Sequence, residues 1–175
     1  GMASVQQPCS MAWLPSGSMA WLRRPGLVPG LLRRLPEQRS SSSSLQDGSD
    51  RLIGSVHTWI VKTPRHTILI DTCLGNDKQR HNAAWNKLDT PFLNRLRACG
   101  CPPESVDFVM CTHLHVDHVG WNTRLVDGRW VPTFPKAKYV FSDRELAYWT
   151  EAEKGNQAMA PWITDAVLPI VAAKR

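Results

Sequence analysis

The seven residues from Thr112 to His118 are the part of the sequence best suited to chemistry, because three of the six histidines and one aspartate fall within them. His113 and His115 are two residues apart, and on an extended backbone such residues point to the same side. A tight turn after them would bring Asp117 and His118 alongside. Imidazole nitrogens and carboxylate oxygens suit a divalent ion such as zinc, and iron or manganese tolerates the same ligands. The spacing therefore predicts a metal site.

The other three histidines, His57, His66 and His81, stand alone in the sequence. Each is interpreted as an ordinary surface or core residue. The clustered histidines differ from them, because charged imidazoles that lie close together repel one another and metal binding removes that cost.

Three strands are predicted before the histidine cluster, residues 112–118. Residues 55–62 alternate in polarity, residues 63–66 supply a turn, and residues 67–71 form the returning strand. A short apolar strand at residues 107–111 leads directly into the cluster.

Helices are predicted between and after these strands. Asp89 or Thr90 caps the first helix, Pro91 lies in its first turn and Gly100 ends it. The later elements are a strand at residues 138–141, a helix capped by Ser142 or Asp143, and an apolar helix at residues 165–173. Interleaved strands and helices favour a layered α/β architecture.

The motif Thr112–His118 resembles the signature of the metallo-β-lactamase superfamily, and the segment Ile68–Thr72 resembles its upstream strand that ends in an aspartate. Residues 54–149 are similar to the general hydrolase branch of that superfamily, near lactonases and phosphotriesterases. The resemblance implies a metallo-β-lactamase-like αββα sandwich, of which this chain holds the first half.

The resemblance also implies a role for each residue of the site. His113 and His115 bind one metal ion, and Asp117 and His118 bind a second, so that the complete enzyme holds two Zn²⁺ ions. Asp71 lies behind the ligands and accepts a hydrogen bond from one of their imidazoles, which orients that ring. A turn residue at the strand end is the alternative interpretation of Asp71.

The implied activity is hydrolysis of a small-molecule ester or lactone by a hydroxide that bridges the two ions. Asp117 is then also catalytic, because it orients the nucleophile or passes a proton to the leaving group. Trp121 and Asn122 are candidates for lining the substrate pocket, with the core as the alternative place for Trp121. Nuclease, glyoxalase-type thioesterase and true β-lactamase activities are less favoured.

The family completes its site with a histidine, an aspartate and another histidine downstream, whereas no histidine follows His118 here. Asp127, Asp143 and Asp165 remain, without histidine partners. Truncation at Arg175 is favoured over a gene fragment or completion by another chain. The rival function is a non-catalytic remnant that binds metal weakly or not at all. A chain of this kind is expected to be a poor catalyst and to fold with marginal stability. Assembly into a homo-oligomer is an open alternative.

Charge and composition exclude several other classes. The net charge is +6, but the basic residues are scattered and form no block, which argues against nucleic-acid binding. No apolar run reaches the roughly 18 to 20 residues that cross a bilayer. The five cysteines follow no disulfide or zinc-thiolate spacing. Free thiols in a cytoplasmic protein are therefore expected.

Residues 1–50 differ from residues 51–175, which form the predicted domain. They hold a near repeat, a five-serine run and no acidic residue before Glu37. A disordered or atypical leader is predicted, and an organelle transit peptide is the alternative interpretation.

Overall fold

The computed structural model describes residues 4–13, 19–20, 45–46, 52–53, 55–155 and 160–175. The chain divides into one compact unit of residues 1–9 and 56–175 and another of residues 10–55. The predicted leader at residues 1–50 falls largely outside the described residues and stays a prediction.

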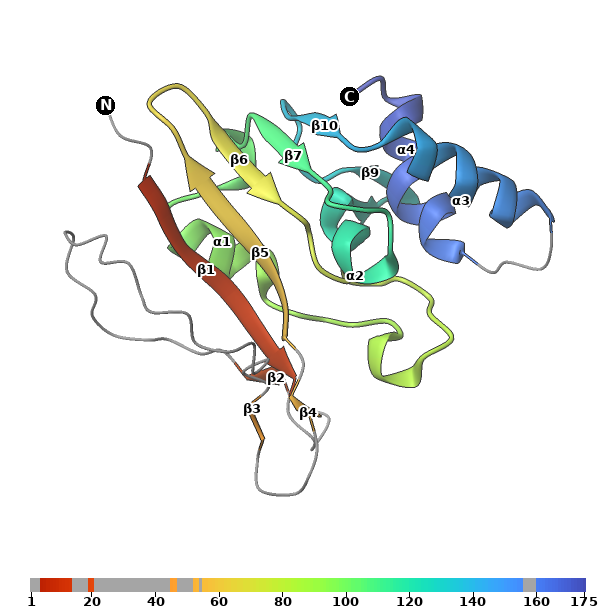
Figure 1. Ribbon diagram of the computed structural model, residues 1–175, viewed down its shortest axis with the longest axis horizontal. Coiled ribbons are helices and arrows are strands. Elements are labelled where there is room, and N and C mark those ends of the chain that lie inside the picture. Colours follow the sequence, from red (N-terminus) through yellow and green to blue (C-terminus); the bar gives the residue numbers. More distant parts are fainter. Residues whose placement is uncertain (1–3, 14–18, 21–44, 47–51, 54, 156–159) are drawn as a thin grey trace, which may run out of the picture. The chain divides into compact units, whose positions relative to one another are not determined.

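The larger unit is built on a sheet in which β10, β7, β6, β5 and the start of β1 follow one another (Figure 1). The strands are β1 (Ser4–Trp13), β5 (Ser55–Lys62), β6 (Thr67–Ile70), β7 (Phe108–Met110) and β10 (Lys138–Val140). β5 and β6 are antiparallel, whereas β6, β7 and β10 are parallel to one another. The predicted strands are thereby confirmed.

The turn between β5 and β6 is held by Thr63. Its backbone N–H donates to the carbonyl of His66 at 2.8 Å, and its hydroxyl oxygen accepts from the His66 N–H at 2.9 Å. These bonds close the hairpin that the sequence predicts at residues 63–66.

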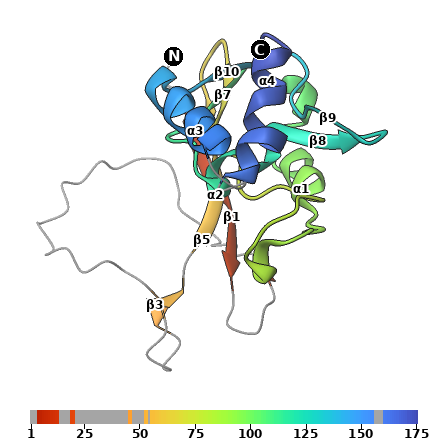
Figure 2. The same cartoon turned by 90° about the vertical axis from the view of Figure 1, so that its right-hand side faces the viewer.

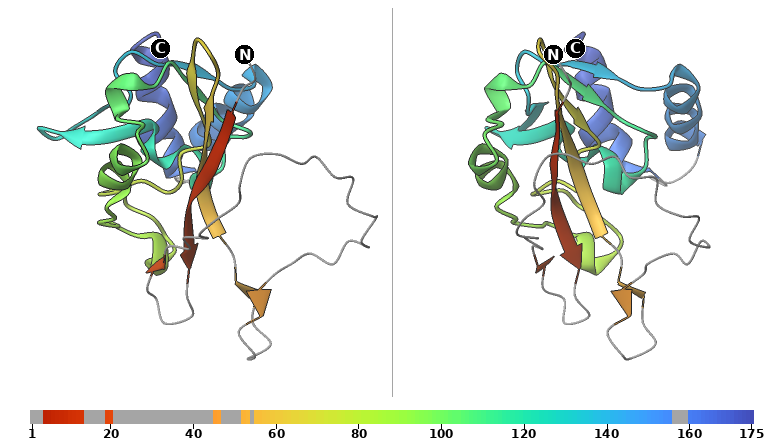
Figure 3. Two further views of the ribbon diagram at one scale, coloured as in Figure 1. Left: turned by 90° about the vertical axis from the view of Figure 1, so that its left-hand side faces the viewer. Right: turned by 60° about the vertical axis from the view of Figure 1, so that its left-hand side comes forward.

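The two faces of the sheet differ in burial. Leu69 and Val109 are fully buried on one face, which α1 covers (Figures 1 and 3). On the other face Ile70, Met110 and Val140 share one row across three strands. Met110 is 44% exposed and Val140 50% exposed. The core therefore lies on the helix-covered side.

The first helix is α1 (Phe92–Ala98), and Pro91 occupies its N-cap position without a side-chain capping bond. The predicted caps Asp89 and Thr90 are wrong, because Thr90 bonds to the side chain of Asn76 instead. The helix is followed by Gly100, whose φ of +68° suits glycine. Two 3₁₀ turns flank this region, η1 (Ala83–Trp85) and η2 (Pro103–Ser105).

After β7 the chain forms α2 (Val116–Val119), the 3₁₀ turn η3 (Gly120–Asn122) and a separate hairpin of β8 (Thr123–Val126) and β9 (Arg129–Pro132). The hairpin extends away from the sheet (Figures 2 and 3). This hairpin was not predicted from the sequence, although Asp127 and Gly128 form an Asp-Gly pair with φ of +48° and +75°. Such a pair is a strong hairpin signal.

The C-terminal part contains α3 (Asp143–Gly155), the π-helical turn η4 (Ile163–Val167) and α4 (Leu168–Ala172). The Ser142 hydroxyl accepts from the Glu145 N–H at 3.4 Å, so Ser142 is the cap of α3. α3 and the last two elements lie side by side (Figures 1 and 2). Of the helices in the described ranges, none has the length and apolar character needed to cross a membrane.

The described residues of the smaller unit include three short strands. The end of β1 pairs with β2 (Met19–Ala20), and β3 (Leu45–Gln46) pairs with β4 (Leu52–Ile53).

Three of the cysteines, Cys73, Cys101 and Cys111, are free as predicted, and all three are buried. Cys99 is disulfide-bonded, so the prediction of free thiols is wrong for this residue. Sequence spacing could not reveal this bond, because disulfide pairing depends on which residues the fold brings together.

Candidate metal centre

The site lies where two neighbouring parallel strands end at the same edge of the sheet (Figure 1). Asp71 follows β6, and the segment from Thr112 to His118 follows β7. The backbone N–H of Asp71 donates to the carbonyl of Met110 at 2.9 Å, and that of Thr72 donates to the carbonyl of His118 at 2.7 Å. The pairing of β6 with β7 therefore places Asp71 beside the histidine cluster.

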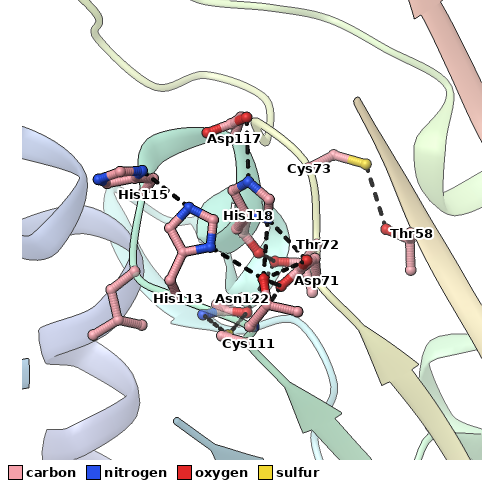
Figure 4. Close-up of polar contacts among 12 residues, drawn as sticks. Thr58, Asp71, Thr72, Cys73, Cys111, His113, His115, Asp117, His118 and Asn122 are labelled. Atoms are coloured by element: carbon pink, nitrogen blue, oxygen red, sulfur yellow. Dashed lines mark hydrogen bonds and ion pairs between the residues drawn. The ribbon is translucent and has the colours of Figure 1, made fainter. Parts of the chain in front are cut away.

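His113 and His115 turn their rings toward each other (Figure 4). Nε2 of His113 lies 2.9 Å from Nδ1 of His115, and the ring centroids are 4.5 Å apart. Leu114, between them, is fully buried. The two imidazoles thus share one side of the segment, as the two-residue spacing predicts.

Asp117 and His118 are brought to the same place by the short helix α2. Nε2 of His118 lies 3.3 Å from Oδ2 of Asp117. The rings of His113 and His118 have centroids 4.0 Å apart. All four predicted ligands therefore lie together.

Asp71 lies behind His118 on the side away from Asp117. Its Oδ2 lies 2.8 Å from Nδ1 of His118, and its Oδ1 accepts from the backbone N–H of Thr112 at 2.8 Å. Asp71 is 7% exposed and has a φ of +58°. This is the position predicted for a carboxylate that orients a ligand imidazole.

Charge is distributed unevenly over the cluster. Hydrogen bonds to Asp117 and Asp71 raise the pKa of His118 to about 9. Burial acts to raise the pKa of Asp71, but the hydrogen bonds from His118 and Thr112 outweigh it and leave this pKa lowered. Burial and the neighbouring histidines lower the pKa of His113. In the metal-free chain, an imidazolium at position 118 therefore lies between two carboxylates.

The segment that carries the histidines is anchored by residues that sequence analysis missed. Glu145 in α3 accepts from the backbone N–H of Leu114 and from the indole N–H of Trp149, both at 3.1 Å. Trp162 donates to the carbonyl of Leu114 at 2.7 Å. The sequence carries no local signal for these bonds, because the partners are 31 and 48 residues away.

A close backbone crossing holds the two segments of the site together. Gly120 donates from its N–H to the carbonyl of Cys73 at 2.7 Å. A Cβ on Gly120 would lie 1.9 Å from the carbonyl carbon of Leu74. The crossing therefore requires glycine at position 120.

Trp121 and Asn122, the candidates for lining the substrate pocket, have buried side chains. Trp121 is 5% exposed and stacks on Phe92 at 5.1 Å, and Asn122 is fully buried. The Asn122 amide oxygen accepts from the Thr72 hydroxyl at 2.9 Å. Both side chains belong to the core, because the turn η3 directs them beneath the metal motif.

The donor atoms of the cluster form two pairs, and the spacing within each pair can be compared with that of two ligands on one divalent ion. Two ligands of one tetrahedral zinc ion, each at about 2.0–2.1 Å, lie about 3.3 Å apart. The pair of His113 and His115 has a separation of 2.9 Å, and the pair of Asp117 and His118 has one of 3.3 Å. Within the described part of the chain, no three His, Cys, Asp or Glu side chains are arranged to hold one ion. Each ion would therefore have two ligands from these residues.

The later aspartates lie elsewhere. Asp127 forms the β8–β9 turn, and Asp143 begins α3. Asp165 is paired with Lys78 and Arg80. None of the three is placed as a further ligand.

Comparison with known proteins gives one family match. The model of the metallo-beta-lactamase superfamily matches residues 52–171. A comparison with curated proteins finds no match.

Solved structures are also similar to the chain. AbOPH, a hydrolase in the beta lactamase superfamily, is 29% identical with a TM-score of 0.53, over 75% of this chain and 44% of that one. A probable metal-dependent hydrolase from Staphylococcus aureus is 22% identical with a TM-score of 0.48, over 60% and 37%. AidC, a dizinc quorum-quenching lactonase, is 19% identical with a TM-score of 0.44, over 68% and 39%. The chain spans less than half the length of each.

Proposed function

Because this chain belongs to the metallo-β-lactamase superfamily, we propose that the whole protein is a metal-dependent hydrolase of carboxylic esters or lactones. The family match confirms the resemblance predicted from Thr112–His118 and the predicted α/β fold. The observation that carries the proposal is the convergence of three imidazoles and two carboxylates at one edge of the sheet (Figure 4).

In this proposal His113 and His115 hold one divalent ion, and Asp117 and His118 hold a second. When bound, the ions would supply hydroxide at neutral pH and polarise the carbonyl of the substrate. Zinc is the proposed metal because its preferred ligands are nitrogen, sulfur and carboxylate oxygen, and iron or manganese would accept the same set.

The protein's own residues position the ligand imidazole and transfer a proton to the leaving group. Asp71 holds the His118 ring through Nδ1, which directs Nε2 toward Asp117. Ester hydrolysis breaks the bond between the acyl carbon and the alkoxide oxygen, and the departing alkoxide needs a proton. We propose that the Asp117 carboxylate, whose side chain is 31% exposed, takes a proton from the attacking water or hydroxide and passes it to the alkoxide.

The ester and lactone class rests on the similarity of residues 54–149 to the lactonase and phosphotriesterase branch. A non-catalytic remnant is the rival proposal. The observation in its favour is that the described residues supply two donors for each ion, whereas catalytic zinc sites have three protein ligands.

The test is to load the chain with zinc and measure metal stoichiometry together with hydrolysis of p-nitrophenyl acetate and γ-butyrolactone. His115→Ala should abolish turnover and weaken zinc binding with an unchanged circular dichroism spectrum. His66→Ala is the matched control, because His66 is exposed and lies at the β5–β6 turn.

Undiminished turnover in His115→Ala would refute the proposed mechanism. Zinc binding without turnover, in the chain and in any longer natural form of the protein, would favour the remnant.

A further inference from the structure

A second charged cluster lies outside the histidine cluster, between the loop after β6 and the turn η4. Lys78 and Arg80 are buried there and both pair with Asp165. Nζ of Lys78 lies 3.3 Å from Oδ1 of Asp165, and Nη1 of Arg80 lies 2.6 Å from Oδ2. Two cations share one carboxylate, so these three side chains have one positive charge in excess, and the exposed carboxylate of Asp77 offsets part of it at Lys78.

Lys78 uses its donors within the protein. It donates to the hydroxyl of Thr123 at 2.8 Å and to the backbone carbonyl of Asp165 at 3.1 Å, and its Nζ lies 3.7 Å above the ring of Trp130. Burial lowers the pKa of Lys78 to about 8, which leaves it protonated at neutral pH. The excess charge is therefore not relieved at Lys78.

Arg80 has an unused donor. A guanidinium carries five N–H groups, which form two forks that each match a carboxylate or phosphate. The Nη1–Nη2 fork is occupied by Asp165, at 2.6 and 2.9 Å, and Nη1 also donates to the carbonyl of Gln79. Nε has no partner among the described residues, although the Arg80 side chain is only 3% exposed. The Nε–Nη2 edge of the guanidinium therefore carries an N–H group, that of Nε, which is buried and without a partner among the described residues.

Arg80 also lines a pocket of about 310 Å³, together with Gln79, His81 and Pro161. Small-molecule sites begin at roughly this volume. Gln79 and His81 are exposed, so that an amide and an imidazole stand at the wall of this Arg80 pocket.

We propose that the Arg80 pocket binds an oxyanion group, a carboxylate or a phosphate, of a small molecule. The Nε–Nη2 edge of Arg80 receives the anion after a small adjustment of this buried edge, and Gln79 and His81 contribute further donors. The anion neutralises the excess charge of the cluster. This site goes beyond the proposed hydrolase, because none of its residues belongs to the histidine cluster.

The proposal is tested by calorimetric titration of the chelator-treated chain with inorganic phosphate, with acetate and with 4-hydroxybutyrate, at constant ionic strength. We expect one equivalent of oxyanion to bind saturably to each chain. Tighter binding of 4-hydroxybutyrate than of acetate and phosphate would identify a hydrolysis product as the source. Tighter binding of phosphate would identify a phosphorylated ligand or free phosphate.

Arg80→Lys keeps the charge and removes the fork, so it should weaken binding by about tenfold or more. Arg97→Lys is the matched control, because Arg97 is exposed and pairs with Glu104 at 3.6 Å. Gln79→Ala and His81→Ala alter exposed side chains and should each weaken binding severalfold. If Arg80→Lys does not fold, the affinities of Gln79→Ala and His81→Ala test the proposal in its place.

No saturable binding of any of the three anions would overturn the proposal. Equal affinity in the wild type, Arg80→Lys and both wall variants would overturn it as well, because the anion would then bind elsewhere.

Discussion

Asp71→Asn is the most informative change in the histidine cluster, because it alters one atom and keeps the shape. Asparagine tolerates the φ of +58° at this position. The amide oxygen can still accept from the Thr112 N–H, which lies 2.8 Å from Oδ1. The amide nitrogen then faces Nδ1 of His118, at the 2.8 Å position where Oδ2 stood.

The consequence is a change of tautomer. When a metal ion is bound, Asp71 would accept a hydrogen bond from the protonated Nδ1 of His118, which leaves the lone pair of this ring on Nε2, the atom that faces Asp117 at 3.3 Å. An amide N–H can only donate to an unprotonated Nδ1, so the proton moves to Nε2 and blocks that atom as a metal ligand. Rotating the amide instead would place its N–H group against the Thr112 N–H.

The magnitude follows from the bond that is lost. A hydrogen bond to a charged group contributes about 1.5–3 kcal/mol, which corresponds to about 10- to 150-fold in an equilibrium constant. Loss of the carboxylate behind a metal-bound histidine typically costs about 10- to 100-fold in metal affinity. We therefore expect Asp71→Asn to bind zinc roughly 10- to 100-fold more weakly.

The assay is competition for zinc with a chromophoric chelator, together with thermal unfolding in excess chelator to measure the metal-free fold. Asp107→Asn is the matched control, because Asp107 accepts from the Thr67 N–H at 2.8 Å at the opposite end of the same two strands. Wild-type zinc affinity in a folded Asp71→Asn variant would refute the reasoning.

Two further predictions concern stability. Gly120→Ala should lower the free energy of unfolding in urea by on the order of 3 kcal/mol, because its Cβ would lie 1.9 Å from the Leu74 backbone. Gly128→Ala should lower it by only about 1–2 kcal/mol, because its Cβ would meet no atom within 4 Å and only the positive φ is strained. Equal losses would contradict the close crossing. Lys78 has a folded pKa of about 8 against 10.5, so between these values the unfolded chain binds more protons and stability should rise with pH. Lys78→Met should remove that rise, and parallel profiles for the two proteins would contradict the burial of the Lys78 ammonium group.

Local patterns were sufficient for the parts of the fold that depend on neighbouring residues. The β5–β6 hairpin follows from alternation and a four-residue turn, and the shared side of His113 and His115 follows from their spacing. The cap of α3 at Ser142 was also predicted, whereas the cap of α1 was not, because Asn76 takes the bonds of Thr90.

The sequence by itself determined the histidine motif, the family and the order of the main strands and helices, though not the β8–β9 hairpin, because each of these depends on residues within a few positions of one another. Among the distant groups that support the motif, the resemblance implied Asp71, whereas only the tertiary structure revealed Glu145 and Trp162. Parallel pairing of β6 with β7 brings Asp71 to His118 across 47 residues, and packing of α3 brings Glu145 to Leu114. Tertiary structure also decided that Asp165 meets Lys78 and Arg80 rather than the histidines, because long-range packing and not spacing selects the partner of a buried charge.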